Sequence, residues 1–284
     1  MILIADSGST KTDWALVSED GESVKRFASQ GINPVHQSED YIYKVICDVR
    51  DSWCDMRRAE HSIRVFFYGA GCVEPWSEQV RNVLSKCFPQ AEILSVASDL
   101  LGAARAVCGH EHGIACILGT GANSCLYDGE RIVKNVPPLG YILGDEGSGA
   151  VLGRMFFNAI FKGALSETLR DDYLCTTGIT YSDVIERVYR QPLANRFLAS
   201  TSLFISQHLD CEELRELVKE NFRQFFRKNI SRYDCRQLPV GAVGSVAWIY
   251  KPLLAEVALE EGYQLGVVCK SPIEGLITFH QGES

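Results

Sequence analysis

The amino-acid sequence predicts an α/β protein made of two related lobes, and three observations lead to that expectation. Two apolar strands each end in a turn of small and hydroxyl-bearing residues, in ADSGSTKTDW and in ILGTGANS. After each turn the chain follows the same order of hairpin, strand, helix, strand and helix, from Ile2 and from about Gly113. The length of 284 residues suits one large or two modest domains. We expect a first lobe over 1–109 and a second over 110–284, with the option that a C-terminal helix, about 272–284, packs back on the first.

The elements of the first lobe follow from local patterns. Ile2–Ala5 is typical of a buried strand, and Trp14–Val17 returns as its hairpin partner. A helical spacing of apolar residues begins after Ser38, which is a plausible cap. Further strands are expected at 65–68 and 93–97, and further helices at 75–86 and 100–107.

The second lobe repeats this order with an insertion. Gly113–Leu118 is an apolar strand, residues 119–124 form its turn, and Cys125–Tyr127 returns. The helical insertion covers about 150–232. The remaining elements are a helix at 147–162, a strand at 239–243, a helix at 246–259, a strand at 264–269 and a last helix from Pro272.

Composition limits the classes of partner. Apolar residues make up 46% of the chain and charged residues 23%, which is ordinary globular composition. The net charge of −8 argues against nucleic acid or an acidic membrane as the main partner, since either calls for a basic patch. The N-terminus is too short and too quickly acidic for a signal peptide, and no apolar run approaches about 18 residues. We expect a cytoplasmic protein.

The 11 cysteines include no Cys-x-x-Cys pair. Reduced, buried thiols are the expectation, because a zinc or iron–sulfur site needs clustered spacing. That spacing is missing within this chain.

The first turn has two interpretations. A hairpin tip rich in Gly, Ser and Thr can present N–H groups and hydroxyls to a phosphate, and small residues let the backbone approach it. Lys11 could add a positive charge and Asp6 could hold a hydrated Mg²⁺. An ordinary hairpin is the alternative. The repetition of the theme in the second turn favours two lobes that close on one polyphosphate.

Three further clusters are candidates for chemistry. Asp99 stands at a strand-to-helix junction, where it is either a helix N-cap or a base facing a ligand beyond the strand ends. Gly144–Gly149 has three glycines in six positions, which favours a ligand-approach loop over a mere helix start. Pro239–Ser245 is a strand–Gly–helix turn that suits either a ligand or close helix–strand packing.

In this order, the clusters resemble the N-acetylglucosamine kinase branch of the sugar kinase/actin/heat-shock chaperone ATPase superfamily, which is grouped with the BadF/BadG/BcrA/BcrD-type ATPases. The matching stretches are ADSGSTKTDW, GINP, SDLLGAARAV, ILGTGANS, GYILGDEGSGAVLG and PVGAVGS, over residues 5 to about 245. The first hairpin departs from the more Gly-rich family pattern. The resemblance implies two ribonuclease-H-like, actin-like ATPase lobes with a cleft between them and extra helices in the second.

The resemblance also implies roles for individual residues. Asp99 would be the base, Asp6 would organise Mg²⁺, and ATP would be the phosphate donor. The residues that would contact the sugar are Asn33, Thr120, Gly121, Asn123, Gly144 and Asp145. The residues that would contact the nucleotide are Ser9, Thr10, Lys11, Thr12, Gly119, Gly241, Gly244 and Ser245.

The expected activity is ATP-dependent phosphorylation of the 6-hydroxyl of an amino sugar, with N-acetylglucosamine as the first choice. Glucosamine, N-acetylmannosamine and muramic acid are the other sugars, since their kinases share the scaffold. The alternative class is an ATP-switched activator of the BadF type, whose iron–sulfur cluster is held by cysteines from two subunits. A homodimer is possible by resemblance alone, and the repressor-branch zinc cluster is not expected.

Overall fold

The computed structural model covers residues 1–284 and describes 1–8, 10–18, 21, 23–53 and 62–282. The chain forms two compact units, here called the first and second lobes. The first lobe comprises Met1–Glu111, Gly129–Arg131 and Ser271–Ser284, and the second comprises His112–Asp128 and Ile132–Lys270. The end of the chain therefore returns to the first lobe.

The described residues of the first lobe form a five-stranded mixed sheet in the order β3-β2-β1-β4-β5. Its strands are β1 (Ile2–Ser7), β2 (Lys11–Val17), β3 (Val24–Gln30), β4 (Ile63–Gly69) and β5 (Ala91–Ser98). The central strand β1 pairs antiparallel with β2 and parallel with β4. Three strands therefore end at one edge of the sheet, where Asp6, Gly69 and Asp99 follow or close them.

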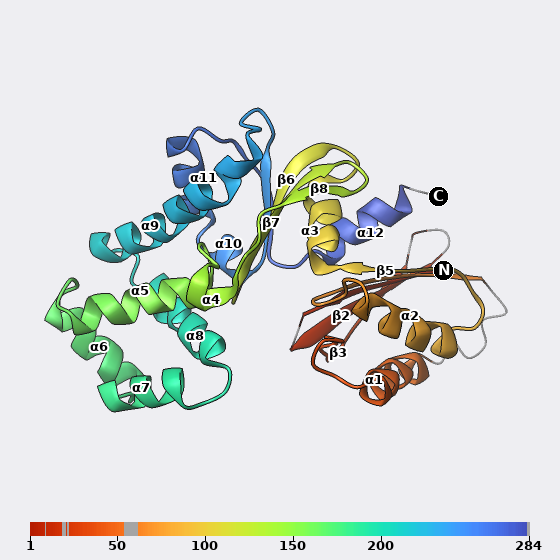
Figure 1. Ribbon diagram of the computed structural model, residues 1–284, viewed down its shortest axis with the longest axis horizontal. Helices are drawn as coiled ribbons and strands as arrows, with labels where there is room; N and C mark the ends of the chain where they lie inside the picture. The colour runs from red at the N-terminus through yellow and green to blue at the C-terminus, as the bar shows by residue number, and fades with distance from the viewer. Residues whose placement is uncertain (9, 19–20, 22, 54–61, 283–284) are drawn as a thin grey trace. The chain divides into compact units, whose positions relative to one another are not determined.

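Helices cover both faces of this sheet, which explains why β1 is a continuous apolar run. Leu3 and Ala5 belong to the core on the side of α1 (Glu39–Ser52) and α2 (Trp76–Cys87). Ile2 and Ile4 belong to the core on the side of α3 (Asp99–Cys108) and α12 (Ile273–Gln281). Figure 1 shows the two helix pairs on opposite sides of the sheet.

The C-terminal helix α12 is fixed to the first lobe by polar and apolar contacts. His280 is fully buried, stacks on Phe66 with ring centroids 3.7 Å apart, and its Nε2 lies 2.8 Å from the Tyr68 hydroxyl. Arg105 Nη1 donates to the same hydroxyl at 2.7 Å. A segment far away in the sequence thus completes the core of this lobe.

The second lobe repeats the sheet, in the order β10-β9-β6-β7-β8. Its strands are β6 (His112–Leu118), β7 (Ala122–Asp128), β8 (Ile132–Asn135), β9 (Val240–Val243) and β10 (Leu265–Cys269). As in the first lobe, the central strand β6 pairs antiparallel with its hairpin partner and parallel with the next strand, β9. Because β7 begins at Ala122, the turn is shorter than expected and Asn123 lies in a strand.

A helical region inserted between β8 and β9 packs against this sheet (Figure 1). Its elements are α4 (Gly140–Leu143), α5 (Gly149–Phe161), α6 (Glu167–Thr177), α7 (Tyr181–Tyr189), α8 (Ala194–Gln207), α9 (Glu212–Lys228) and the 3₁₀ helix η1 (Ile230–Tyr233). The core includes Phe156, Phe222, Phe225 and Phe226, each nearly inaccessible to solvent. The aromatic run of α9 is therefore core.

One expected helix, 246–259, is in fact two: α10 (Ser245–Ile249) and α11 (Lys251–Glu260). Pro252 lies in the first turn of α11. A proline in the middle of a single helix would remove a backbone donor and clash with the preceding turn, so the chain breaks at Tyr250. Within the described ranges, no helix combines the length and apolar character needed to cross a membrane.

Candidate active site

The first-lobe hairpin is held by side-chain hydroxyls. Ser7 and Thr12 face each other across β1 and β2, with their oxygens 2.7 Å apart and both side chains buried. Ser7 Oγ also donates to the Ile32 carbonyl and accepts from the Ile32 N–H at 2.9 Å. Thr12 Oγ1 donates to the Gln30 carbonyl at 3.1 Å. The Thr12 hydroxyl therefore shapes the turn from inside the lobe.

The tip of this hairpin is exposed. Thr10 and Lys11 lie at the surface, and Lys11 Nζ forms an ion pair with Asp13 at 2.6 Å. Gly8 N–H donates to the Lys11 carbonyl, which closes the turn. Ser9, expected to contact nucleotide, lies outside the described residues.

Asp6 stands at the end of β1, on the sheet face that also carries Ile2 and Ile4. Burial raises its pKa from 3.8 to about 7, with further increases from the charges of Asp99 and Asp13 and a decrease from Lys11. Desolvation and like charges both disfavour the ionised form of a carboxyl group. The ionised form of Asp6 is therefore unfavourable, and a nearby cation would stabilise it.

Asp99 is the first residue of α3, and the cap of that helix is Ser98, whose hydroxyl accepts from Leu101 N–H at 3.3 Å. The N-cap interpretation of Asp99 is therefore wrong, because the preceding serine already does that work. Asp99 Oδ1 accepts from Leu100 N–H at 2.8 Å. Burial raises the pKa of Asp99, and backbone hydrogen bonds partly oppose the shift.

The residues around Asp6 fit a hydrated Mg²⁺. This ion binds proteins through one or two carboxylates and keeps several waters or phosphate oxygens. Asp6 supplies one such oxygen donor, and its electrostatic interaction with Asp99 places two carboxylates in one negative region. Within the described ranges, no group of three or more His, Cys, Asp or Glu side chains is arranged for a metal.

Asn33 lies in the loop after β3, beside the loop after β4. Its Oδ1 accepts from Val35 N–H at 3.1 Å, and its own N–H donates to Gln37 Oε1 at 2.8 Å. A Cβ on Gly71 would come within 2.5 Å of Asn33 Oδ1, so this glycine lets the two loops touch. Cys72 follows directly, and burial and then the charge of Asp99 raise its pKa to about 12.

The second-lobe hairpin is held by backbone atoms instead. The carbonyls of Gly119 and Thr120 accept from the N–H groups of Gly149 and Ala150, at 2.8 and 3.1 Å. These donors belong to the first turn of α5, whose N–H groups have no partner inside the helix. The turn and the start of α5 therefore form one unit.

The loop before α5 carries Asp145 in a left-handed conformation, with φ of 53°. Its N–H donates to the Pro138 carbonyl at 2.8 Å, and a Cβ on Gly121 would meet its Oδ2 at 3.1 Å. Burial raises the pKa of Asp145 to about 6, opposed by a hydrogen bond from the Ala122 backbone and assisted by Glu146. Positive φ is uncommon for residues other than glycine, and the hydrogen bond to Pro138 holds Asp145 in this conformation.

Gly144 is buried next to this aspartate, and a Cβ there would meet the Pro138 carbonyl at 2.1 Å. Asn123 lies near the start of β7, where its Oδ1 accepts from Ser124 N–H and from Asn135 Nδ2, each at 2.9 Å. The amide orientation of Asn123 is therefore fixed by a neighbouring strand.

A cavity of about 300 Å³ in the second lobe brings two of the expected nucleotide contacts together. Gly119, Thr120 and Ser245 line it, together with Arg196 of α8. Gly241 lies in β9 and Gly244 in the turn directly before Ser245, and neither glycine lines the cavity. Thr120 was expected to contact the sugar, but it lines the same cavity as Gly119 and Ser245, which were expected to contact the nucleotide.

Three residues of the site escaped the sequence reasoning. Asn221 of α9 is fully buried, accepts from Gly147 N–H at 2.9 Å and donates to the Ser148 carbonyl at 3.1 Å. Arg196 of α8 lines the same cavity as Gly119 and Ser245, and Asn135 of β8 donates to Asn123 Oδ1 from the neighbouring strand. A polar residue inside the apolar pattern of α9 was the one available signal, and it pointed only to Asn221.

The protein was compared with known families and structures. No family model and no curated protein matches the chain. A solved structure from Porphyromonas gingivalis, of a protein provisionally assigned as an N-acetylglucosamine kinase, is 47% identical, covers 99% of each chain and has a TM-score of 0.93. A similarly assigned protein from Chromobacterium violaceum is 18% identical over 98% of each chain, with a TM-score of 0.73.

The fold extends to more distant enzymes. A ROK family glucokinase from Streptomyces griseus, solved with glucose and AMPPNP, is 15% identical over 98% of each chain, with a TM-score of 0.52. The repeated sheet order and these likenesses define the actin-like ATPase fold. The identity of 47% over nearly the whole chain is more specific. The protein belongs to the N-acetylglucosamine kinase branch of the sugar kinase/actin/heat-shock chaperone ATPase superfamily.

Proposed function

We propose that this protein is an ATP-dependent sugar kinase that phosphorylates the 6-hydroxyl of N-acetylglucosamine. The observation that carries the proposal is the 47% identity, over 99% of both chains, with a protein provisionally assigned as an N-acetylglucosamine kinase. The chemistry available in the first lobe supports it. Phosphoryl transfer needs positioned groups and neutralised charge rather than covalent catalysis.

Asp99 is the proposed base. Its carboxylate takes the proton from the sugar hydroxyl while the hydroxyl oxygen forms a bond to the γ-phosphorus of ATP. The bond from that phosphorus to the β-phosphate oxygen breaks, and ADP leaves with the electron pair. Burial raises the pKa of Asp99, which makes its ionised form a stronger proton acceptor than an exposed aspartate.

Asp6 is the proposed ligand of Mg²⁺. When bound, the ion would neutralise charge on the transferred phosphate. The carboxylate of Asp6 would hold the ion by one oxygen, and its raised pKa would fall as the cation offsets Asp99 and Asp13.

The remaining roles divide between sugar and nucleotide. Asn33, Asn123 and Asp145 are proposed to hydrogen-bond the sugar, and the small or short residues Thr120, Gly121 and Gly144 to leave it room. Nucleotide contacts are assigned to Thr10, Lys11, Gly119, Gly241, Gly244 and Ser245. Thr12 acts on the phosphates through the turn that its hydroxyl holds. The protein is proposed to work in the cytoplasm.

The test is sugar-dependent formation of ADP. The purified protein is incubated with Mg²⁺, ATP and, separately, N-acetylglucosamine, glucosamine, N-acetylmannosamine or muramic acid. We expect the highest kcat/KM with N-acetylglucosamine, and a kcat lowered by about 10²–10⁴ in Asp99→Asn. A higher value for another sugar would correct the substrate but leave the kinase. ADP formation that no sugar stimulates would contradict a sugar kinase and favour the ATP-switched activator.

A further inference from the structure

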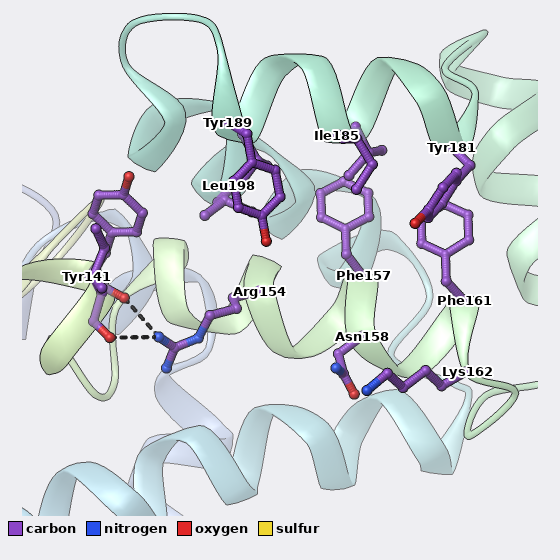
Figure 2. A pocket seen from close by; sticks show the side chains of 13 residues that line it. Tyr141, Arg154, Phe157, Asn158, Phe161, Lys162, Tyr181, Ile185, Tyr189 and Leu198 are labelled. Carbon is purple, nitrogen blue, oxygen red and sulfur yellow. Dashed lines mark hydrogen bonds between the residues drawn. The ribbon is translucent and has the colours of Figure 1, made fainter.

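A second, larger cavity lies in the helical insertion. Its volume is about 590 Å³, within the range of small-molecule pockets. It is bounded by α5, α7 and α8, with α4 at one end (Figure 2). None of the residues assigned to sugar or nucleotide lines it.

Aromatic rings form its walls. Phe157 and Phe161 project from α5 towards Tyr181 and Ile185 of α7 (Figure 2). Phe161 and Tyr181 meet edge to face with ring centroids 5.1 Å apart. Tyr181 is 59% exposed and Tyr189 is 77% exposed, although both line the cavity. Flat ring faces at a wet opening suit a flat apolar guest.

Two cations mark the other side of the cavity. Arg154 and Asn158 of α5 and Lys162, the residue that follows its last turn, are spaced four residues apart and extend from one side of the helix (Figure 2). Arg154 Nη1 donates to the carbonyls of Tyr141 and Ile142, at 2.9 and 3.2 Å. Neither Arg154 nor Lys162 forms an ion pair with a carboxylate of the described residues. Arg154 is thus partly satisfied by two carbonyls, whereas Lys162 is exposed and has no carboxylate partner among the described residues.

We propose that this cavity is a binding site for a small organic anion with a flat apolar body. The body lies against the aromatic wall formed by Phe161 and Tyr181, and the anionic group meets Lys162, with Asn158 as a further donor. This site goes beyond the proposed kinase activity and does not depend on it. The argument rests on volume, on aromatic walls and on the complementary charge of the cations.

A protein partner is the competing occupant, because Ile142 and Leu143 of α4 are 69% and 75% exposed beside the opening. Exposed apolar patches often mark protein interfaces. A concave space of this volume with cations along one edge is better matched to a small anion, since a flat interface would not fill it. The two occupants predict different selectivity, because only a site for a small anion should prefer a charged ligand over an uncharged one of the same shape.

The experiment uses two dyes that share a body and differ in charge. 1-Anilinonaphthalene-8-sulfonate is anionic, and N-phenyl-1-naphthylamine lacks the sulfonate. Each is titrated into the full chain, with fluorescence and calorimetry as readouts. We expect one saturable site per chain for the sulfonate, with about fivefold tighter binding than for the uncharged dye, the size of one exposed charge pair.

Three variants locate the site. Lys162→Gln is expected to weaken the sulfonate about fivefold and leave the uncharged dye unchanged. Tyr181→Ser is expected to weaken both dyes, because it removes a wall. Lys251→Gln, at an exposed lysine of α11, is the matched control and should change neither. Circular dichroism confirms that each variant is folded.

The contrary results are specific. Equal affinity for the two dyes, several weak sites, or sulfonate binding that Lys162→Gln leaves intact would each overturn the proposal. Light scattering separates the competing occupant. A dimer that dissociates as the dye binds would make this face an interface between copies and would equally overturn it.

Discussion

The two hairpins stand at equivalent places in their sheets, yet they are built from different chemistry. In the first lobe, hydroxyls of Ser7 and Thr12 close the turn from inside. In the second, carbonyls of Gly119 and Thr120 accept from the start of α5. The first lobe carries two carboxylates that influence each other, since the charge of Asp99 raises the pKa of Asp6. The second lobe contributes close backbone packing, which sets the shape of its turn.

The difference teaches why two turns of similar composition tolerate different changes. A turn held by side chains depends on residue type and accepts small changes of backbone space. The second-lobe turn is instead bounded by one close approach: a Cβ on Gly244 would lie 2.3 Å from the Leu118 carbonyl, whereas a Cβ on Gly119 would meet nothing within 4 Å. The proposed sugar and nucleotide contacts are divided between the two lobes, whereas the proposed base and the proposed Mg²⁺ ligand both lie in the first lobe.

The largest expected effect separates the carboxylates of the two lobes. Asp99→Asn removes the proposed base and should lower kcat by about 10²–10⁴. Asp145→Asn should mainly raise KM, because its proposed partner is the sugar in both the bound ground state and the transition state. ATP binding, measured by calorimetry, should be unchanged in both. A normal kcat in Asp99→Asn would remove its role.

The next effect compares two glycines by thermal and urea unfolding. Gly244 has φ of 124°, and a Cβ there would lie 2.3 Å from the Leu118 carbonyl. Gly244→Ala should therefore cost about 2–4 kcal/mol of unfolding free energy. In Gly8→Ala the Cβ would lie 3.6 Å from the Lys11 carbonyl, an ordinary contact, so the change should stay within about 0.5 kcal/mol. Equal losses would refute the contrast.

Asp6 predicts a pH dependence of stability. Its pKa rises from 3.8 to about 7 on folding, so the folded state binds the extra proton between these values. Stability is therefore greatest below about pH 4 for this group and is lost as the pH rises through 7, by about 2 kcal/mol after allowance for partial exposure. Asp6→Asn should flatten this slope in melting curves from pH 5 to 8. Mg²⁺ should stabilise the parent protein at pH 8 and leave the variant unchanged.

The smallest expected effect tests the hydroxyl network. Thr12→Val removes the contacts to Ser7 and Gln30 and should cost about 1–2 kcal/mol of unfolding free energy. Thr12→Ser keeps the oxygen and should cost less. If the two variants unfold alike, the hydroxyl does not hold the turn.

Much of the fold was predictable because buried strands produce continuous apolar runs between helical patterns. Ile2–Ala5 and Gly113–Leu118 are such runs, and each became the centre of a sheet. Pro252 signals the helix break at Tyr250, but the apolar pattern over 246–259 favoured one continuous helix. The identity of the α3 cap depended on which of two adjacent good caps, Ser98 or Asp99, bonds the third N–H, which only geometry decides.

The candidate site was predictable where it consists of turns that follow strands. Asp6, Thr10 and Gly119 stand out in the sequence for that reason. Asn221 and Arg196 did not, because their partners are tens of residues away and their roles arise from helix packing. Roles in binding remain predictions for all of these positions.

The central claim is that a sugar hydroxyl is phosphorylated with Asp99 as base. The most direct measurement is ³¹P and ¹³C NMR of the product formed from N-acetylglucosamine, ATP and Mg²⁺ by the parent protein and by Asp99→Asn. The account predicts a phosphate on the 6-oxygen with the parent protein and formation of sugar phosphate slowed by about 10²–10⁴ with the variant. Phosphate at another position, or the same product at the same rate from both proteins, would contradict it.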